Sequence, residues 1–241
     1  MGKRRKDLPF IEGLHITTLA AEGKAMGKVD NQVVFVPMTV PGDIVDVQVR
    51  KHHRRYMEAT VVRYVERSPL RTEPFCDHFG VCGGCKWQNL PYDEQLKQKT
   101  KQVEDQLVRI GHLTIPEVRP CLGSARTREY RNKLEFTFAD RRWLTYEEIA
   151  AGGDIEPMPA VGFHIPGCFD KVLDIERCHL QDDISNRIRL ATKQYCIDHG
   201  YTFHNARAHE GLMRTMVVRT ASTGEIMVIV VFNENDRERI D

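Results

Sequence analysis

Three cysteines lie within ten residues, in the run Cys76-Asp77-His78-Phe79-Gly80-Val81-Cys82-Gly83-Gly84-Cys85. The spacing is C-x5-C-x2-C, and its glycines let the backbone wrap closely around a metal centre with N–H groups directed at the sulfurs. Three thiolates placed this close together call for a fourth ligand. Four further cysteines are candidates for it, and spacing alone does not choose between them: Cys121, Cys168, Cys178 and Cys196. Cys178 follows an expected strand and precedes an expected helix, whereas Cys196 falls inside that helix, where a core position is expected.

Two kinds of centre compete for these cysteines. Structural zinc usually joins two short cysteine or histidine knuckles, and His78 offers an imidazole. One compact triplet with a remote cysteine is instead the arrangement of many iron–sulfur proteins, so the spacing favours a cluster. An odd number of cysteines, seven, after a start with no signal-peptide apolar segment argues against a disulfide framework. Buried thiols without a metal are the third alternative, which the polar Gly-Gly loop disfavours.

The first part of the chain reads as short strands separated by turn signals. Val45, Val47 and Val49 alternate with polar residues, as in a strand with one buried face. The pattern predicts a small all-β barrel of the OB type, a fold that commonly binds oligonucleotides. Ser68-Pro69 closes this unit, so we expect domains at residues 1–68 and 69–241. The expected strands are Ile11 to Leu19, Gln32 to Val36, Ile44 to Val49 and Ala59 to Val65.

The second part of the chain mixes helix and strand signals. An amphipathic helix is expected after Pro91, with Leu96, Val103, Leu107 and Ile110 on one stripe. Another is expected from Asp182 to His199, with Ile184, Ile188, Ala191 and Tyr195 facing inward. Turns at Pro166-Gly167 and Thr223-Gly224 indicate hairpins, and hence an antiparallel sheet in an α+β domain. Its expected strands are Arg131 to Phe138, Ala160 to Ile165, Lys171 to Ile175, Met213 to Arg219 and Glu225 to Phe232.

Basic residues are concentrated at the front, although the formal net charge is only +1. Residues 1–71 hold thirteen Lys and Arg against eight Asp and Glu. A positive run with an adjacent aromatic falls between two expected barrel strands, where it suits phosphate contact and base stacking; the alternative is a solvated hairpin tip. No apolar run is long enough to span a bilayer, so a cytoplasmic protein without a membrane partner is expected. The candidate RNA contacts are Lys51, His52, Arg54, Arg55 and Tyr56, with Arg131 and Lys133 as a second group.

The cysteine run and its surroundings resemble a known family. Phe75-Cys76 through Cys82-Gly83-Gly84-Cys85-Lys86-Trp87-Gln88, followed by Tyr92-Asp93-Glu94-Gln95-Leu96-Lys97, is similar to the cluster loop of the 23S ribosomal RNA (uracil-5-)-methyltransferases of the RumA type. The order of a TRAM-like barrel, this loop, Tyr130-Arg131-Asn132-Lys133 and the stretch from Val172 to Cys178 matches as well. The resemblance implies a 4Fe-4S cluster held by Cys76, Cys82, Cys85 and Cys178.

The same resemblance implies an activity. It is the S-adenosylmethionine-dependent formation of 5-methyluridine in 23S ribosomal RNA, by a monomer that binds RNA and not DNA. In that family a cysteine adds to C6 of uracil, the enolate takes the methyl group and a base removes the C5 proton. The target base must leave its stack to be reached.

The chain departs from the family at its end. Those enzymes finish in a Rossmann-like domain, and we see neither a glycine-rich turn after a strand nor a Pro-Cys-Arg type motif in this sequence. We therefore expect that domain to be absent, S-adenosylmethionine to bind only to the full-length enzyme, and this chain to hold no catalytic or cofactor-binding residue and to be inactive alone. Three alternatives stay open: a transfer RNA uracil-5-methyltransferase, a non-catalytic zinc- or iron–sulfur-stapled RNA-binding module, and a redox protein, for which no flavin or nicotinamide fingerprint is seen.

Overall fold

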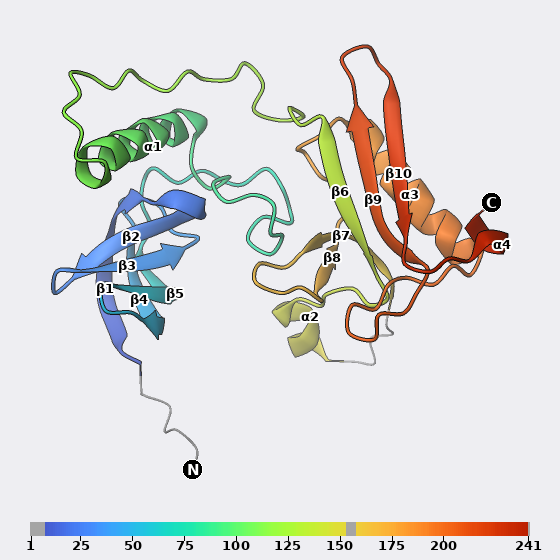
Figure 1. Ribbon diagram of the computed structural model, residues 1–241. Coiled ribbons are helices and arrows are strands. Elements are labelled where there is room, and N and C mark those ends of the chain that lie inside the picture. Colours follow the sequence, from blue (N-terminus) through green and yellow to red (C-terminus); the bar gives the residue numbers. More distant parts are fainter. Residues whose placement is uncertain (1–7, 153–157, 241) are drawn as a thin grey trace. The chain divides into compact units, whose positions relative to one another are not determined.

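The computed structural model describes residues 8–152 and 158–240, and the chain forms two compact units (Figure 1). The first unit holds the residues up to Phe75 together with Lys86–Ala125. The second holds Cys76–Cys85 and the residues from Arg126 onward. The cysteine loop thus belongs to the second unit although both of its flanking segments belong to the first, a division that differs from a single boundary near residue 68. In the described ranges, no helix is long and apolar enough to cross a membrane.

The first unit is built on a closed barrel in the order β1-β2-β3-β5-β4. Neighbouring strands are antiparallel except β3 and β5, which run parallel. Val45, Val47 and Val49 are at most 1% exposed, so the predicted inward face of β4 is confirmed. The strands are β1 (Phe10–Leu19), β2 (Lys24–Val29), β3 (Gln32–Pro37), β4 (Ile44–His52) and β5 (Tyr56–Glu66), and a short 3-10 turn (Ala21–Gly23) precedes β2.

Strand β2 was not among the expected strands. Its sequence, Lys-Ala-Met-Gly-Lys-Val, has few β-branched residues and so carries little strand signal. The barrel requires it, because β1 and β3 pair with its two edges. At Gly27 a Cβ would lie 2.3 Å from the His15 carbonyl oxygen, so glycine is needed where β1 crosses closely.

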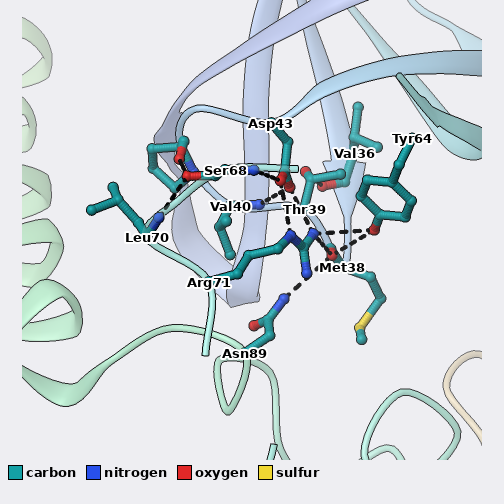
Figure 2. Close-up of polar contacts among 11 residues, drawn as sticks. Val36, Met38, Thr39, Val40, Asp43, Tyr64, Ser68, Leu70, Arg71 and Asn89 are labelled. Carbon is teal, nitrogen blue, oxygen red and sulfur yellow. Dashed lines mark hydrogen bonds and ion pairs between the residues drawn. The ribbon is translucent and has the colours of Figure 1, made fainter. Parts of the chain in front are cut away.

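A buried ion pair fastens the chain after β5 back onto the barrel (Figure 2). Asp43 is fully buried, and its carboxylate accepts from Arg71 Nε at 2.8 Å and Nη2 at 2.6 Å. The same carboxylate accepts from the backbone N–H groups of Ser68 at 2.9 Å and Val40 at 2.8 Å. Arg71 also donates to the Met38 carbonyl at 3.1 Å. Every part of this carboxylate is therefore satisfied, which is what allows a charge to be buried there.

Helix α1 (Tyr92–Asp105) and a π-helical turn (Gln106–Ile110) complete the first unit. The Gln98 side chain accepts from the Leu19 N–H at 3.3 Å, which ties α1 to β1. The expected apolar stripe is not a buried face: α1 and the π turn contain no buried residue, and Val103 and Ile110 are 48% and 75% exposed.

The second unit is a five-stranded antiparallel sheet in the order β10-β9-β6-β7-β8. Figure 1 shows α3 lying along one face of this sheet. Phe136, Phe138, Met216 and Val218 are fully buried on that face. The strands are β6 (Lys133–Ala139), β7 (Ala160–His164), β8 (Val172–Asp174), β9 (Met213–Thr220) and β10 (Ile226–Phe232), and the helices are α2 (Tyr146–Ala151), α3 (Asp183–Asp198) and α4 (Arg237–Ile240).

The inward face of α3 is polar, which corrects the expected apolar stripe. Ile184 and Ile188 are only half-buried, and Ala191 and Tyr195 are exposed. The residues of α3 that are buried are Ser185, Asn186, Arg189 and Cys196. Arg189 is 0% exposed, and its guanidinium lies over the Phe136 ring at 5.6 Å. Asn186 and Arg189 form hydrogen bonds with backbone groups of Cys178 and Glu176, in the segment that precedes α3.

Candidate functional site

The cysteine loop is shaped by successive tight turns. Phe79 N–H donates to the Cys76 carbonyl at 3.0 Å, and Cys82 N–H donates to the His78 carbonyl at 2.9 Å. Gly80 has φ of 94°, a conformation that glycine adopts without strain. The Gly84 N–H donates to the Cys82 sulfur at 3.4 Å, the kind of contact that stabilises negative charge on a thiolate.

Two hydrogen bonds connect the cysteine loop to other segments of the second unit. Gly83 N–H donates to the carbonyl of His164, at the end of β7, at 3.2 Å. The Glu176 N–H donates to Nε2 of His78 at 3.0 Å, so this ring nitrogen is engaged by the segment that leads to Cys178. Considered as a zinc ligand, His78 would have to give up this bond to coordinate through Nε2.

The buried polar residues of α3 fix the backbone around Cys178. Its N–H donates to Asn186 Oδ1 at 2.8 Å, and Asn186 Nδ2 donates to its carbonyl at 3.0 Å. Arg189 donates to the carbonyls of Glu176 at 2.7 Å and Val161 at 3.2 Å. Burial lowers the pKa of the Arg189 guanidinium, and the nearby Asp174 and Cys178 oppose the shift. A buried cation therefore stands close to the Cys178 thiol.

Cys76, Cys82 and Cys85 lie near enough to Cys178 for their charges to affect its thiol. Cys82 and Cys85 pack against the buried cluster that contains Cys178. Burial raises the pKa of Cys178 to about 11, and the charges of Cys85, Cys82 and Cys76 add to the shift. Burial also raises the pKa of Cys76, to which Cys85 contributes. A bound cation would favour the thiolate forms of Cys76 and Cys178, which burial disfavours.

The other cysteines stand apart from this group. Cys121 is exposed and belongs to the first unit. Cys196 is 2% exposed within α3, and burial raises its pKa to about 11. Cys168 lines a hollow with Gly83 and Gly84. The cysteines whose charges raise the pKa of Cys178 are Cys76, Cys82 and Cys85. Within residues 8–152 and 158–240, no group of three or more His, Cys, Asp or Glu side chains is arranged to hold a metal ion.

The two glycines of the loop make a matched pair for a test. A Cβ at Gly83 would lie 2.6 Å from the His164 carbonyl oxygen, whereas at Gly84 it would meet only the Cys82 sulfur at 3.5 Å. Gly83→Ala is expected to detach the loop from β7 at a cost of roughly 1–3 kcal/mol, and Gly84→Ala to change little. Hydrogen exchange of the loop amides and thermal unfolding measure both. Equal protection of the loop in the two variants would contradict this packing.

The basic run forms the tip of the β4–β5 hairpin, in the first unit. Residues 51–55 are all exposed, and the His53 N–H closes the turn onto the Tyr56 carbonyl at 2.9 Å. Lys51 pairs with Glu58 at 3.4 Å, and His52 contacts Gln32 at 3.3 Å. These two are therefore partly engaged, whereas Arg54 and Arg55 project at the tip.

Tyr56 is more enclosed than a free stacking platform would be. It is half-buried and stacks on His53, with 4.4 Å between the ring centroids. The outer ring of this stack, His53, is exposed and was not among the candidate contacts. The second basic group lies in the other unit, where Lys133 begins β6 and Arg131 is an exposed residue just before it.

Sequence reasoning missed the residues that position the cysteines. Asn186 and Arg189 lie in a helix for which the apolar residues predict the buried face. The two residues are spaced i, i+3 and so share one helix face, which is the signal that could have identified them.

Comparisons with known proteins agree with the barrel and extend over about nine-tenths of the chain. Residues 12–62 match the TRAM domain. A protein of Bacteroides thetaiotaomicron named "Uncharacterized RNA methyltransferase" is 58% identical over 213 residues, which are 88% of this chain and 47% of that protein. One of the same name from Porphyromonas gingivalis is 51% identical, over 92% of this chain and 49% of its own length. The chain thus spans about half the length of these relatives.

A solved structure is similar as well. It is the crystal structure of Pyrococcus abyssi tRNA (uracil-54, C5)-methyltransferase in complex with S-adenosyl-L-homocysteine. The sequence identity is 25% and the TM-score 0.62, over 92% of this chain and 46% of that one.

These matches correct two expectations, a fold class without a methyltransferase domain and a chain inactive for that reason. Between 88% and 92% of the chain aligns with proteins that are named as methyltransferases. The expectation rested on motifs not seen, and a missing short motif is weak evidence that a domain is missing. Residues 12–62 match the TRAM domain, and the chain is similar over nearly its whole length to proteins named RNA methyltransferases.

Proposed function

We propose that the protein containing this chain is an S-adenosylmethionine-dependent RNA methyltransferase that forms 5-methyluridine in 23S ribosomal RNA. The observation that carries the proposal is the match of nearly the whole chain to RNA methyltransferases, including one solved with S-adenosyl-L-homocysteine. The TRAM match and the exposed basic tip at residues 51–55 supply an RNA-binding surface. The cofactor of the proposed reaction is S-adenosylmethionine.

The proposal includes a 4Fe-4S cluster on Cys76, Cys82, Cys85 and Cys178. Two observations support it: Cys82 and Cys85 pack against the buried cluster that contains Cys178, and the Gly84 N–H donates to the Cys82 sulfur. The buried guanidinium of Arg189 beside Cys178 suits an anionic occupant. Bound there, a cluster would join the cysteine loop to the segment between β8 and α3, which is a structural role.

The sequence spacing of the cysteines favours a cluster over zinc. Four thiolates on one zinc ion at about 2.3 Å each would lie about 3.8 Å apart. In a 4Fe-4S cluster each thiolate binds a different iron atom, so the sulfurs stand farther apart. One compact triplet, Cys76, Cys82 and Cys85, with a remote cysteine is the arrangement of many iron–sulfur proteins.

Transfer RNA is the second candidate substrate. The cysteine-loop resemblance favours ribosomal RNA, whereas the similar solved structure is a tRNA methyltransferase. Both substrates present the same uracil C5, so the reaction is unchanged and only the recognition of the RNA differs.

Nucleoside analysis of cells that lack the gene distinguishes these candidates. Purified 23S ribosomal RNA and transfer RNA would each be digested to nucleosides, and 5-methyluridine measured by mass spectrometry. We expect one site's worth of 5-methyluridine to disappear from 23S ribosomal RNA and to return when the gene is supplied. Loss from transfer RNA alone would select the second candidate, and unchanged 5-methyluridine in both would overturn the proposed activity.

A further inference from the structure

A broad hollow lies on the face of the second unit's sheet that α3 does not cover. Its volume is about 1290 Å³, and its floor includes Thr137 of β6 and Thr215 of β9. These two residues are paired across the strands, so they point to the same face. Their neighbours Phe136 and Met216 point the other way into the core. The hollow therefore lies on the opposite face of the sheet from α3.

The hollow is lined with more positive than negative side chains. Five Lys and Arg residues line it against three Asp and Glu. Four of these cations have carboxylate partners: Lys171 and Arg207 pair with Asp170, Arg142 pairs with Glu148, and Arg141 lies 4.0 Å from Asp140. No carboxylate of the described residues pairs with Arg214, and the Arg141 side chain is 74% exposed. The positive residues are Arg141, Arg142, Lys171, Arg207 and Arg214.

Aromatic side chains accompany these charges. Phe169, on the loop between β7 and β8, lines the hollow with 70% of its surface exposed. Trp143 lies on the same lining, with the Lys171 ammonium 5.9 Å from its ring centroid. An exposed phenylalanine among arginines has a flat face available for stacking, which is how proteins hold unpaired bases.

A second hollow adjoins the first. It measures about 630 Å³ and is lined by Arg131, Gly83 and Gly84. His164 and Phe169 line both hollows, so the Phe169 loop forms the ridge between them. Leu134 and Phe163, which line the second hollow, belong to the core side of the sheet, so the path from Arg214 passes around the Phe169 loop to reach Arg131 and ends beside the cysteine loop.

The ridge is held by the cysteine loop. The Gly83 N–H donates to the His164 carbonyl, and the Thr137 hydroxyl contacts the His164 ring at 3.2 Å. Gly167, at the turn before Phe169, has φ of 76°. The ridge is thus a tight turn fixed at its base, and the position of Phe169 depends on the loop that carries Cys76, Cys82 and Cys85.

We propose that the two hollows and the Phe169 ridge form one binding track for single-stranded RNA. Phe169 stacks on a base at the ridge, and Arg214 and Arg131 contact phosphates on either side of it. The track deepens the proposed function, on which it rests, by naming where the central unit holds RNA. Unpaired RNA is the occupant that matches both features, because duplex RNA hides the base faces that an exposed aromatic binds.

Fluorescence anisotropy with a labelled single-stranded RNA of about 12 nucleotides tests the track. Phe169→Ala is expected to weaken binding on the order of 10-fold, because stacking on one base contributes that much. Phe169→Trp should retain or strengthen binding. Arg214→Ala should lower the slope of log K against log salt by about 0.7, the loss of one phosphate contact. Thermal unfolding of each variant checks that these exposed substitutions leave the fold intact.

Two exposed residues of α3, which line neither hollow, serve as controls. Tyr195 is 52% exposed on α3, and Arg187 is exposed on the same helix. Tyr195→Ala and Arg187→Ala should bind RNA like the parent. Normal binding by Phe169→Ala and Arg214→Ala, or equal losses in the controls, would overturn the track and leave the methyltransferase proposal standing. No RNA binding by the parent, together with unchanged cellular 5-methyluridine, would instead remove both.

Discussion

Replacing Asp43 with alanine is expected to lower the free energy of unfolding of the barrel unit by about 3–5 kcal/mol, because it breaks a buried ion pair from one side. Asp43 is 0% exposed and the Arg71 side chain 16% exposed. The variant leaves the guanidinium and the backbone N–H groups of Ser68 and Val40 without their acceptor. Urea unfolding followed by circular dichroism measures the loss, with the midpoint compared at constant m-value.

Two further variants isolate the pair. Lys97→Ala removes a surface pair with Glu94, in which the lysine is 68% exposed, and should change the midpoint little. Asp43→Ala combined with Arg71→Ala should cost less than the sum of the two single changes, because no unpaired charge remains buried. Additive losses would show that the two side chains stabilise the barrel independently, against the network seen in Figure 2.

Cys178→Ser is expected to abolish iron binding by the protein purified under anaerobic conditions. The proposed cluster has four cysteine ligands, and Cys178 is the one supplied by a different segment from the other three. The parent should hold about four irons and four sulfides per chain with a broad brown absorption, and the variant close to none. Iron, sulfide and zinc determination on the same sample measures this directly.

The remaining cysteines of the second unit provide the controls. Cys196→Ser changes a buried cysteine within α3, and Cys168→Ser changes one beside Gly83 and Gly84. Both variants should keep the iron of the parent. Iron retained by Cys178→Ser but lost by Cys168→Ser would move the fourth ligand to Cys168. One zinc and no iron in the parent would favour the metal-stapled RNA-binding module instead.

Strand positions in the barrel followed from local pattern where the pattern was strong. Val45, Val47 and Val49 alternate, and they point inward. Strand β2 was missed because it has few β-branched residues, and it forms a strand because β1 and β3 pair with it. Pairing partners distant in sequence are not visible to a periodicity argument.

The candidate site divides in the same way. The loop cysteines are close in sequence, so their proximity in space needs no knowledge of the fold, whereas Cys178 joins them only once β8 and α3 are in place. The buried face of α3 was mispredicted because hydrophobicity ranks Ile184 above Asn186, and the bonds to Cys178 reverse that order. Phe169 gave no signal at all, since a single aromatic in a turn has no period.

The course of the chain through the cysteine loop constrains how the protein can be divided. The chain passes from the first unit to the second after Phe75, returns after Cys85 and crosses again after Ala125. Three covalent connections therefore link the units, so one proteolytic cut in any of them leaves the two still joined. A recombinant fragment starting at Arg126 would lack the residues that bond to His164 and Glu176. A fragment meant to contain the whole second unit must therefore include Cys76–Cys85 as well as the residues from Arg126 onward.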